Sequence, residues 1–293
     1  MIDKGSGPTV VLIPGMQGRW EWMAPAVDAL SERCRVVTYS LCGEPGSGRE
    51  LDPRLGFDNL TRQLEATIDR AGIERVVLCG VSFGGLVALR FAAEHPERTA
   101  GLALVSTPGP SWRANARVRR HVRWPRLLAP WFAVTSPLRL IPEITAAFTA
   151  RAEAAAFFFR HSARVAAAPL APTRTAERVR MLMSLNPAAD CVKVGAPTLV
   201  VTGEPALDRV VPADGTREYV RAIPGAEHVL LERTGHIGLV TRPERFAEII
   251  GGFADRALSK YEGRSSKAEV KAEVKEEGRS SNVLQPSDFV LRT

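Results

Sequence analysis

The chain alternates between short, continuously apolar runs and longer segments in which apolar residues recur at helical spacing. Residues 76–79 are of the first kind, and in residues 57–71 Leu60, Leu64 and Ile68 fall on one helical face. Continuous apolar runs are typical of strands buried on both faces of a parallel sheet. The pattern predicts six strands, at residues 9–13, 35–40, 76–79, 99–106, 197–202 and 228–232. Helices between them give an α/β protein with a mostly parallel central sheet.

The alternation stops between residues 108 and 190, a stretch rich in alanine, arginine and proline that predicts several short helices. We expect one α/β core from residues 1–107 and 191–258, with residues 108–190 as a helical insertion after the fourth strand. Residues 259–293 differ again, because a Gly-Arg-Ser-Ser motif occurs twice and charged four-residue repeats lie between the copies. Such a segment buries little apolar surface, which predicts a disordered or transiently helical tail.

Composition is that of a soluble globular protein, with 293 residues and a hydrophobic fraction of 45%. No apolar run approaches the ~20 residues that span a bilayer, and the N-terminus shows no signal-peptide pattern. The cysteines have no metal-ligand spacing, which favours free thiols and a cytoplasmic location. They are Cys34, Cys42, Cys79 and Cys191. The net charge of +7 suits acidic partners or surfaces, but we expect no nucleic-acid partner.

Residues 80–84, Gly-Val-Ser-Phe-Gly, place Ser82 on a sharp turn between an apolar strand and a helix. A nucleophile on such a turn is held in an unfavourable backbone conformation, and the chain segments on either side run close together. A side chain at position 80 or 84 would clash there, which accounts for both glycines. The turn predicts an exposed serine oxygen and a backbone N–H of Phe83 directed at the reacting centre.

A serine nucleophile needs a base, and the base needs an acid that orients it. Of the five histidines, His236 is the best candidate, because it lies between the last strand and the last helix. That loop belongs to the carboxyl edge of the sheet, where open α/β folds bind ligands. The acid is expected in the loop after the preceding strand, which offers Asp208 and, in reserve, Glu204. A turn or helix-cap role would also suit Asp208.

The chain order of serine, acid and histidine, the serine turn and the alternating pattern resemble the α/β-hydrolase superfamily over roughly residues 9–257. The insertion falls where that family carries its lid. Four further segments are similar to family motifs: Ile13-Pro14-Gly15-Met16 to the oxyanion loop, residues 41–47 to the G-x-G-x-S loop, residues 208–212 to the acid motif, and Gly235-His236 to the histidine motif.

The resemblance implies a role for each candidate residue. Ser82 would attack an acyl carbonyl, His236 would act as general base and then general acid, and Asp208 would hold the imidazole. Backbone N–H groups of Phe83 and Met16 would form the oxyanion hole. An acyl-enzyme would follow, and neither a metal nor an organic cofactor would be needed.

The function expected from these roles is a serine hydrolase that cleaves a carboxylic ester, a lactone or a thioester. Two alternatives remain open: an acyltransferase that uses the same triad, and a catalytically inactive ligand-binding protein of the same fold.

The sequence departs from the family pattern at several positions. Pro14 stands where histidine is usual in the oxyanion loop, Ser40 where aspartate is common, and Val81 where histidine is frequent. The loop that leads to Asp208 is two residues longer than usual, which leaves Glu204 open as the acid. The first hairpin of the family's sheet is expected to be missing, which gives six strands rather than eight.

A lid supplies the substrate pockets in this fold, so specificity for a small-molecule acyl substrate is expected to reside in residues 108–190. Within it, residues 111–126 contain six arginines and no acidic residue. This segment is suited to an acidic headgroup, an acyl carrier or an anionic membrane. It is equally suited to the solvated face of a lid helix whose tryptophans pack inward, and the composition favours this second interpretation.

Overall fold

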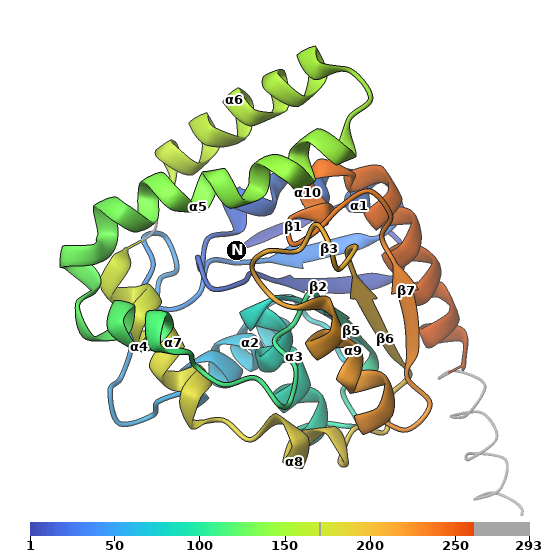
Figure 1. Cartoon of the computed structure of the whole chain (residues 1–293). Coiled ribbons are helices and arrows are strands. Elements are labelled where there is room, and N and C mark those ends of the chain that lie inside the picture. The colour runs from blue at the N-terminus through green and yellow to red at the C-terminus, as the bar shows by residue number, and fades with distance from the viewer. Residues whose placement is uncertain (170, 261–293) are drawn as a thin grey trace, which may run out of the picture.

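The fold is shown as a computed structural model in Figure 1, and the structure describes residues 1–169 and 171–260. The strands of this part of the chain are β1 (Ile2–Lys4), β2 (Thr9–Ile13), β3 (Arg35–Thr38), β4 (Val76–Val81), β5 (Thr99–Val105), β6 (Thr198–Thr202) and β7 (Glu227–Leu230). The helices are η1 (Trp20–Met23), α1 (Ala24–Ser31), α2 (Asp58–Arg70), α3 (Phe83–Glu94), α4 (Ala116–Arg123), α5 (Pro125–Ala147), α6 (Arg151–Ala167), α7 (Pro172–Ser184), α8 (Pro187–Cys191), α9 (Ala213–Ala222) and α10 (Gly238–Thr241). A last helix covers residues 243–260.

The strands form one sheet in the order β1-β3-β2-β4-β5-β6-β7, and every neighbouring pair except β1 and β3 is parallel. The carboxyl ends of parallel strands meet at one edge, so the loops after β2, β4 and β6 come together there. The register sets Ile13 opposite Gly80, which brings the loop after β2 against the serine turn. The predicted α/β fold with a mostly parallel sheet is confirmed.

Helices cover both faces of the sheet, because successive strand residues point to opposite sides. Val10 and Leu12 of β2 pack toward α1 and the helix at 243–260, while Val11 and Ile13 pack toward α2, α3 and α9. The central strands are buried on both sides, as their unbroken apolar runs predict. The sheet is thus packed between two apolar layers, and its loop-bearing edge carries the candidate site.

The expected count of six strands is wrong, because Ile2–Lys4 adds a seventh strand, antiparallel to β3. Gly5 and Gly7 turn the chain between β1 and β2, each with a positive φ, +86° and +101°. Three residues are too few to show a periodic pattern, so this edge strand left no readable signal in the sequence. β1 pairs with β3 rather than β2, so these two consecutive strands do not form a hairpin.

The insertion contains a longer helix than the expected series of short ones. Helix α5 runs for 23 residues with Pro130, Pro137 and Pro142 inside it. A proline in a helix interior removes one hydrogen bond and costs about 3 kcal/mol, which is why this proline-rich stretch predicts short helices. Helix α5 continues through these prolines and packs against α4, α6, α7 and α10. Figure 1 shows α5 and α6 running side by side.

The arginines of residues 111–126 are all exposed, consistent with a solvated helix face. The expectation that both tryptophans pack inward is wrong for one of them. Trp112 packs against the core, whereas the side chain of Trp124 is 52% exposed. Trp124 stands at the corner between α4 and α5, and the guanidinium of Arg123 lies 5.5 Å from its ring centre.

The structure describes only the first two residues of the expected tail, residues 259 and 260. Residues 259 and 260 belong to the last helix, so that helix passes the expected core boundary at 258. The remainder of the expected tail, from residue 261, lies outside the described residues. Among the helices of the described chain, none is both long enough and apolar enough to cross a bilayer.

Candidate active site

Ser82 occupies the turn between β4 and α3 with φ 53° and ψ −120°, a conformation that L-residues rarely adopt. Its backbone N–H donates to the carbonyl of Val105 at 2.7 Å, which ties the turn to β5. The residue is 9% exposed. The strand-to-helix turn that the sequence predicts is therefore present, and the sheet holds its strained residue from the neighbouring strand.

Close backbone approaches on both sides of the turn require glycine. A Cβ at Gly84 would lie 2.5 Å from the carbonyl oxygens of Ile13 and Pro14, in the loop after β2. A Cβ at Gly80 would overlap the first turn of α3. Gly15 is itself so near that a Cβ there would lie 3.2 Å from Cβ of Ser82. The serine turn and the candidate oxyanion loop thus fit together by backbone contact.

The two expected oxyanion donors flank this contact. Phe83 is the first residue of α3, so its N–H has no partner within the helix. The N–H of Met16 makes no hydrogen bond among the described residues. Two backbone donors on adjoining segments can polarise a carbonyl oxygen between them.

Asp208 and His236 meet at the same edge of the sheet, with His236 Nδ1 3.3 Å from Asp208 Oδ2. The other carboxylate oxygen of Asp208 accepts the N–H groups of Val210 and Val211 at 3.0 and 2.9 Å. The Asp208 side chain is 1% exposed and that of His236 is 13% exposed. A buried carboxylate with three partners has one orientation, so it can fix the tautomer and direction of the imidazole.

Glu204, the reserve acid, has a different role. Its Oε1 accepts the backbone N–H of Arg233 at 2.7 Å. Its own carbonyl accepts the N–H groups of Leu207 and Asp208 at 2.9 and 3.0 Å. These hydrogen bonds close a turn over residues 204–208. The structure therefore brings Asp208, and not Glu204, to the histidine.

Electrostatics favour a protonated His236. Burial lowers the pKa of its imidazole, but the hydrogen bond and charge of Asp208 and the charge of Glu143 outweigh burial, so the pKa is raised above the ordinary 6.5. The hydroxyl of Ser82 makes no hydrogen bond to His236 within the described chain. Serine and histidine therefore share the sheet edge, and the structure directly joins only the acid and the histidine.

The other histidines serve elsewhere. His228 Nε2 lies 2.8 Å from the Thr202 hydroxyl, and His161 stacks on Phe157 in α6. No group of three or more His, Cys, Asp or Glu side chains able to hold a metal occurs in the described part of the chain.

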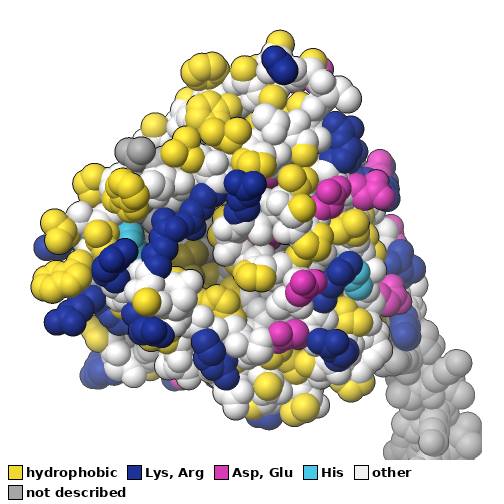
Figure 2. Space-filling view, viewed as in Figure 1, with side chains coloured by type: hydrophobic (Ala, Val, Ile, Leu, Met, Phe, Trp, Pro, Cys, Tyr) yellow, Lys and Arg dark blue, Asp and Glu magenta, His cyan; other side chains and the backbone are white. Residues whose placement is uncertain are grey.

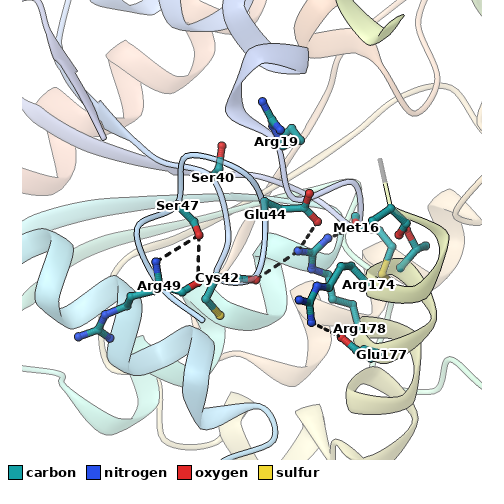
Figure 3. Close-up of polar contacts among 12 residues, drawn as sticks. Met16, Arg19, Ser40, Cys42, Glu44, Ser47, Arg49, Arg174, Glu177 and Arg178 are labelled. Atoms are coloured by element: carbon teal, nitrogen blue, oxygen red, sulfur yellow. Dashed lines mark hydrogen bonds and ion pairs between the residues drawn. The ribbon is translucent and has the colours of Figure 1, made fainter. Parts of the chain in front are cut away.

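Arg178 of α7 is a residue of the site that sequence reasoning missed, and Figure 3 shows it between two loops of the sheet edge. Its Nη1 donates to the carbonyl of Met16 at 3.0 Å, and its Nη2 lies 2.7 Å from Glu44 Oε1. Both charged side chains are buried, 1% and 0% exposed. Arg178 therefore links the insertion to the loop that carries a candidate oxyanion donor.

Glu143 of α5 is a second missed residue, and it is fully buried. Its Oε1 accepts the backbone N–H of Ile237, the residue after His236, at 2.8 Å. Neither Glu143 nor Arg178 stands in a recognisable motif. Their only sequence signal is a charge inside an insertion that is otherwise rich in exposed arginine and apolar residues.

The mostly parallel sheet, the strained serine turn after β4 and the buried acid–histidine pair at the same edge define a protein of the α/β-hydrolase fold. The model of a family described as "Alpha/beta hydrolase family" matches residues 10–249. The chain belongs to this enzyme family, and the resemblance seen in the sequence is confirmed.

Individual relatives agree with this assignment. RutD of Azorhizobium caulinodans, a protein assigned as a carbamate hydrolase, is 26% identical over 255 residues, which cover 85% of this chain and 92% of RutD. Among solved structures, an esterase from Exiguobacterium antarcticum has a TM-score of 0.72 at 18% identity, with 87% of this chain and 94% of the esterase covered. The enol-lactonase of Burkholderia xenovorans LB400 has a TM-score of 0.69 at 23% identity, with 86% and 94% covered.

The contact between the serine turn and the loop after β2 can be tested with Gly84→Ala. Because the added Cβ meets two backbone carbonyls, the free energy of unfolding should fall by about 1–3 kcal/mol, measured by urea denaturation. Gly195→Ala is the matched control, since no atom lies within 4 Å of its added Cβ. Equal stability of the two variants would contradict the proposed fit.

The buried ion pair can be tested with a double-mutant cycle. Arg178→Met leaves the Glu44 carboxylate buried and uncompensated, so the free energy of unfolding should fall by about 3–5 kcal/mol. Adding Glu44→Leu removes the stranded charge and should recover much of that loss in the same urea titration. A double variant as unstable as the sum of the two single variants would argue against a direct pair.

Proposed function

We propose that this protein is a serine hydrolase that cleaves a carboxylic ester, a lactone or a thioester through Ser82, His236 and Asp208. The observation that carries the proposal is the buried Asp208–His236 pair at the sheet edge where Ser82 stands in its strained turn. Such an arrangement of nucleophile, base and orienting acid generates an acyl-enzyme.

The reaction would proceed in two acyl transfers. Asp208 engages Nδ1 of His236, so Nε2 is the nitrogen left to take the proton of Ser82 as the hydroxyl attacks the acyl carbonyl. The N–H groups of Phe83 and Met16 would bind the developing oxyanion. His236 would then protonate the leaving group, and water activated by the same histidine would release the acid. The hydrogen bond between Ser82 and His236 would form when substrate binds, because catalytic hydrogen bonds often tighten only in the complex.

The substrate range is supported by chemistry shared with relatives. Esters, lactones, thioesters and the carbamate named for RutD all present a carbonyl carbon to a nucleophile. Residues 108–190 would act as the lid, since α5 and α7 reach the loops beside His236 and Met16. On the face in Figure 2, Lys and Arg side chains lie above and to the left of a hollow beside α4 and α7, which supports an acidic group on the substrate or its carrier.

Two other functions are distinguished by product analysis. An acyltransferase would pass the acyl group to an added alcohol or amine in preference to water. The inactive ligand-binding alternative is motivated by the unbonded Ser82 hydroxyl and by Pro14 in the oxyanion loop. It predicts tight binding without turnover of any acyl substrate.

Reactivity of Ser82 tests the proposal directly. A fluorophosphonate probe should label the protein rapidly, and Ser82→Ala should abolish labelling because the probe forms its bond with the nucleophilic oxygen. Ser106→Ala is the control, since Ser106 also has a positive φ at the sheet edge, 44°. If the intact, folded protein does not react with the probe, the proposal is wrong. A panel of p-nitrophenyl esters, acyl thioesters and carbamates of graded chain length then identifies the acyl group.

The raised pKa of His236 sets the expected pH dependence. The base must be neutral, so kcat/KM should fall as pH drops through the pKa of His236 in the free enzyme, with an acid limb centred above 6.5. Asp208→Asn should reduce kcat by about 10⁴-fold at neutral pH, as loss of the orienting acid does in serine proteases. Rates of p-nitrophenyl ester hydrolysis between pH 5 and 9 measure both effects. Full activity retained at pH 5 would contradict the role of His236.

A further inference from the structure

Glu143 is a buried carboxyl group that the proposed triad does not use. It lies on α5, in the insertion, and it is 0% exposed. One oxygen accepts the Ile237 N–H, and the other, Oε2, is buried without a hydrogen-bond partner. A buried carboxylate that leaves an oxygen unpaired is costly, so packing alone does not explain this residue.

A second contact ties the same end of α5 to the histidine loop. Nε and Nη2 of Arg233 donate to the carbonyls of Ala146 and Ala147 at 3.0 and 3.2 Å. These are carbonyls of the last helical turn, where a cation is favoured. Arg233 precedes His236 in the chain and Ile237 follows it, so α5 binds the loop both before and after the histidine.

The charges around His236 are negative. Asp208 contacts it from the loop after β6, and the charge of Glu143, which binds the neighbouring Ile237 N–H from α5, also raises its pKa. Arg233, the cation of its own loop, turns away to the end of α5, and Glu204 binds the Arg233 backbone. Burial raises the pKa of Glu143 to about 7 and the nearby Asp208 charge adds to this, while the N–H groups of Gly235 and Ile237 and the charge of His236 oppose it. Glu143 therefore carries its negative charge chiefly above pH 7.

We propose that Glu143 is a positioning residue that holds the main chain beside His236 and supplies a second negative charge to the imidazole. Through these two effects, α5 determines the position and the protonation of the catalytic base. The inference rests on the proposed function only for its effect on rate. Glu143 contacts the backbone of Ile237, and Asp208 retains the Nδ1 contact, so the two carboxyl groups act on His236 in different ways.

Two substitutions separate the charge from the hydrogen bond. Glu143→Gln keeps an oxygen that accepts the Ile237 N–H but removes the charge, so the pKa of His236 should fall by up to about 1 unit while kcat at pH 8.5 stays within about threefold. Glu143→Leu fills similar space but accepts no hydrogen bond. It should lower both the pKa of His236 and kcat, the latter by about tenfold or more, with little change in KM.

The pKa of His236 is measured by NMR titration of the imidazole C–H groups in the full chain, with the signal assigned by comparison with His236→Gln. Asp190→Asn is the matched control, because Asp190 is a buried carboxylate that pairs with Arg90 at 2.8 Å. It should reduce stability without moving the pKa of His236 or the acid limb of kcat/KM.

The outcomes are separable. An unchanged His236 pKa in Glu143→Gln, or a Glu143→Leu variant with the kcat of the parent protein, would overturn the inference. If the parent protein lacks serine reactivity, the proposed function fails, but the NMR titration still decides whether Glu143 acts on His236. A fall in kcat of Glu143→Leu that Glu143→Gln does not share identifies the hydrogen bond to Ile237 as the positioning contact.

Discussion

The candidate site depends on how closely two backbone segments, the loop after β2 and the serine turn, approach each other at the carboxyl edge of the sheet. The carbonyls of Ile13 and Pro14 lie where a side chain at position 84 would stand, and Gly15 lies against Ser82. Ser82 has its strained conformation within this contact, and the candidate oxyanion donors of Phe83 and Met16 lie on the two adjoining segments. Pro14 is accommodated because the contact uses its carbonyl and not its ring.

Charged side chains from the insertion bind the two loops that carry Met16 and His236. Arg178 reaches the Met16 carbonyl from α7, and Glu143 reaches the Ile237 N–H from α5. Both are buried, so each depends on its partner to offset the cost of desolvation. The insertion therefore contributes direct contacts to both loops of the candidate site.

The sequence predicted the parts of the structure that depend on local pattern. Buried strands, their helices and the glycines around Ser82 were readable because burial and backbone crowding restrict residue type at each position. The sequence favoured Asp208 and left Glu204 open, because both lie in one loop; the structure sets the Asp208 carboxylate 3.3 Å from the His236 imidazole. Glu143 was out of reach for a different reason: it lies 94 residues from Ile237, and nothing local marks the pair.

Helix continuity was misjudged for a related cause. Pro130, Pro137 and Pro142 favour breaks locally, but α5 runs through all three while packed against neighbouring helices. Propensity is a weak prior where tertiary contacts outweigh it. The three-residue strand β1 was missed because its antiparallel pairing with β3 is likewise non-local.

The two anchors of the insertion have a consequence for divergence among related chains. Where Glu143, Arg178 and the last turn of α5 align the insertion with the histidine and oxyanion loops, the remaining surfaces of α4, α5 and α6 carry few constraints beyond folding. Substitutions there can reshape the space offered to an acyl or leaving group without misaligning the nucleophile. Substrate preference and catalytic geometry can then evolve on separate residues of the same helices.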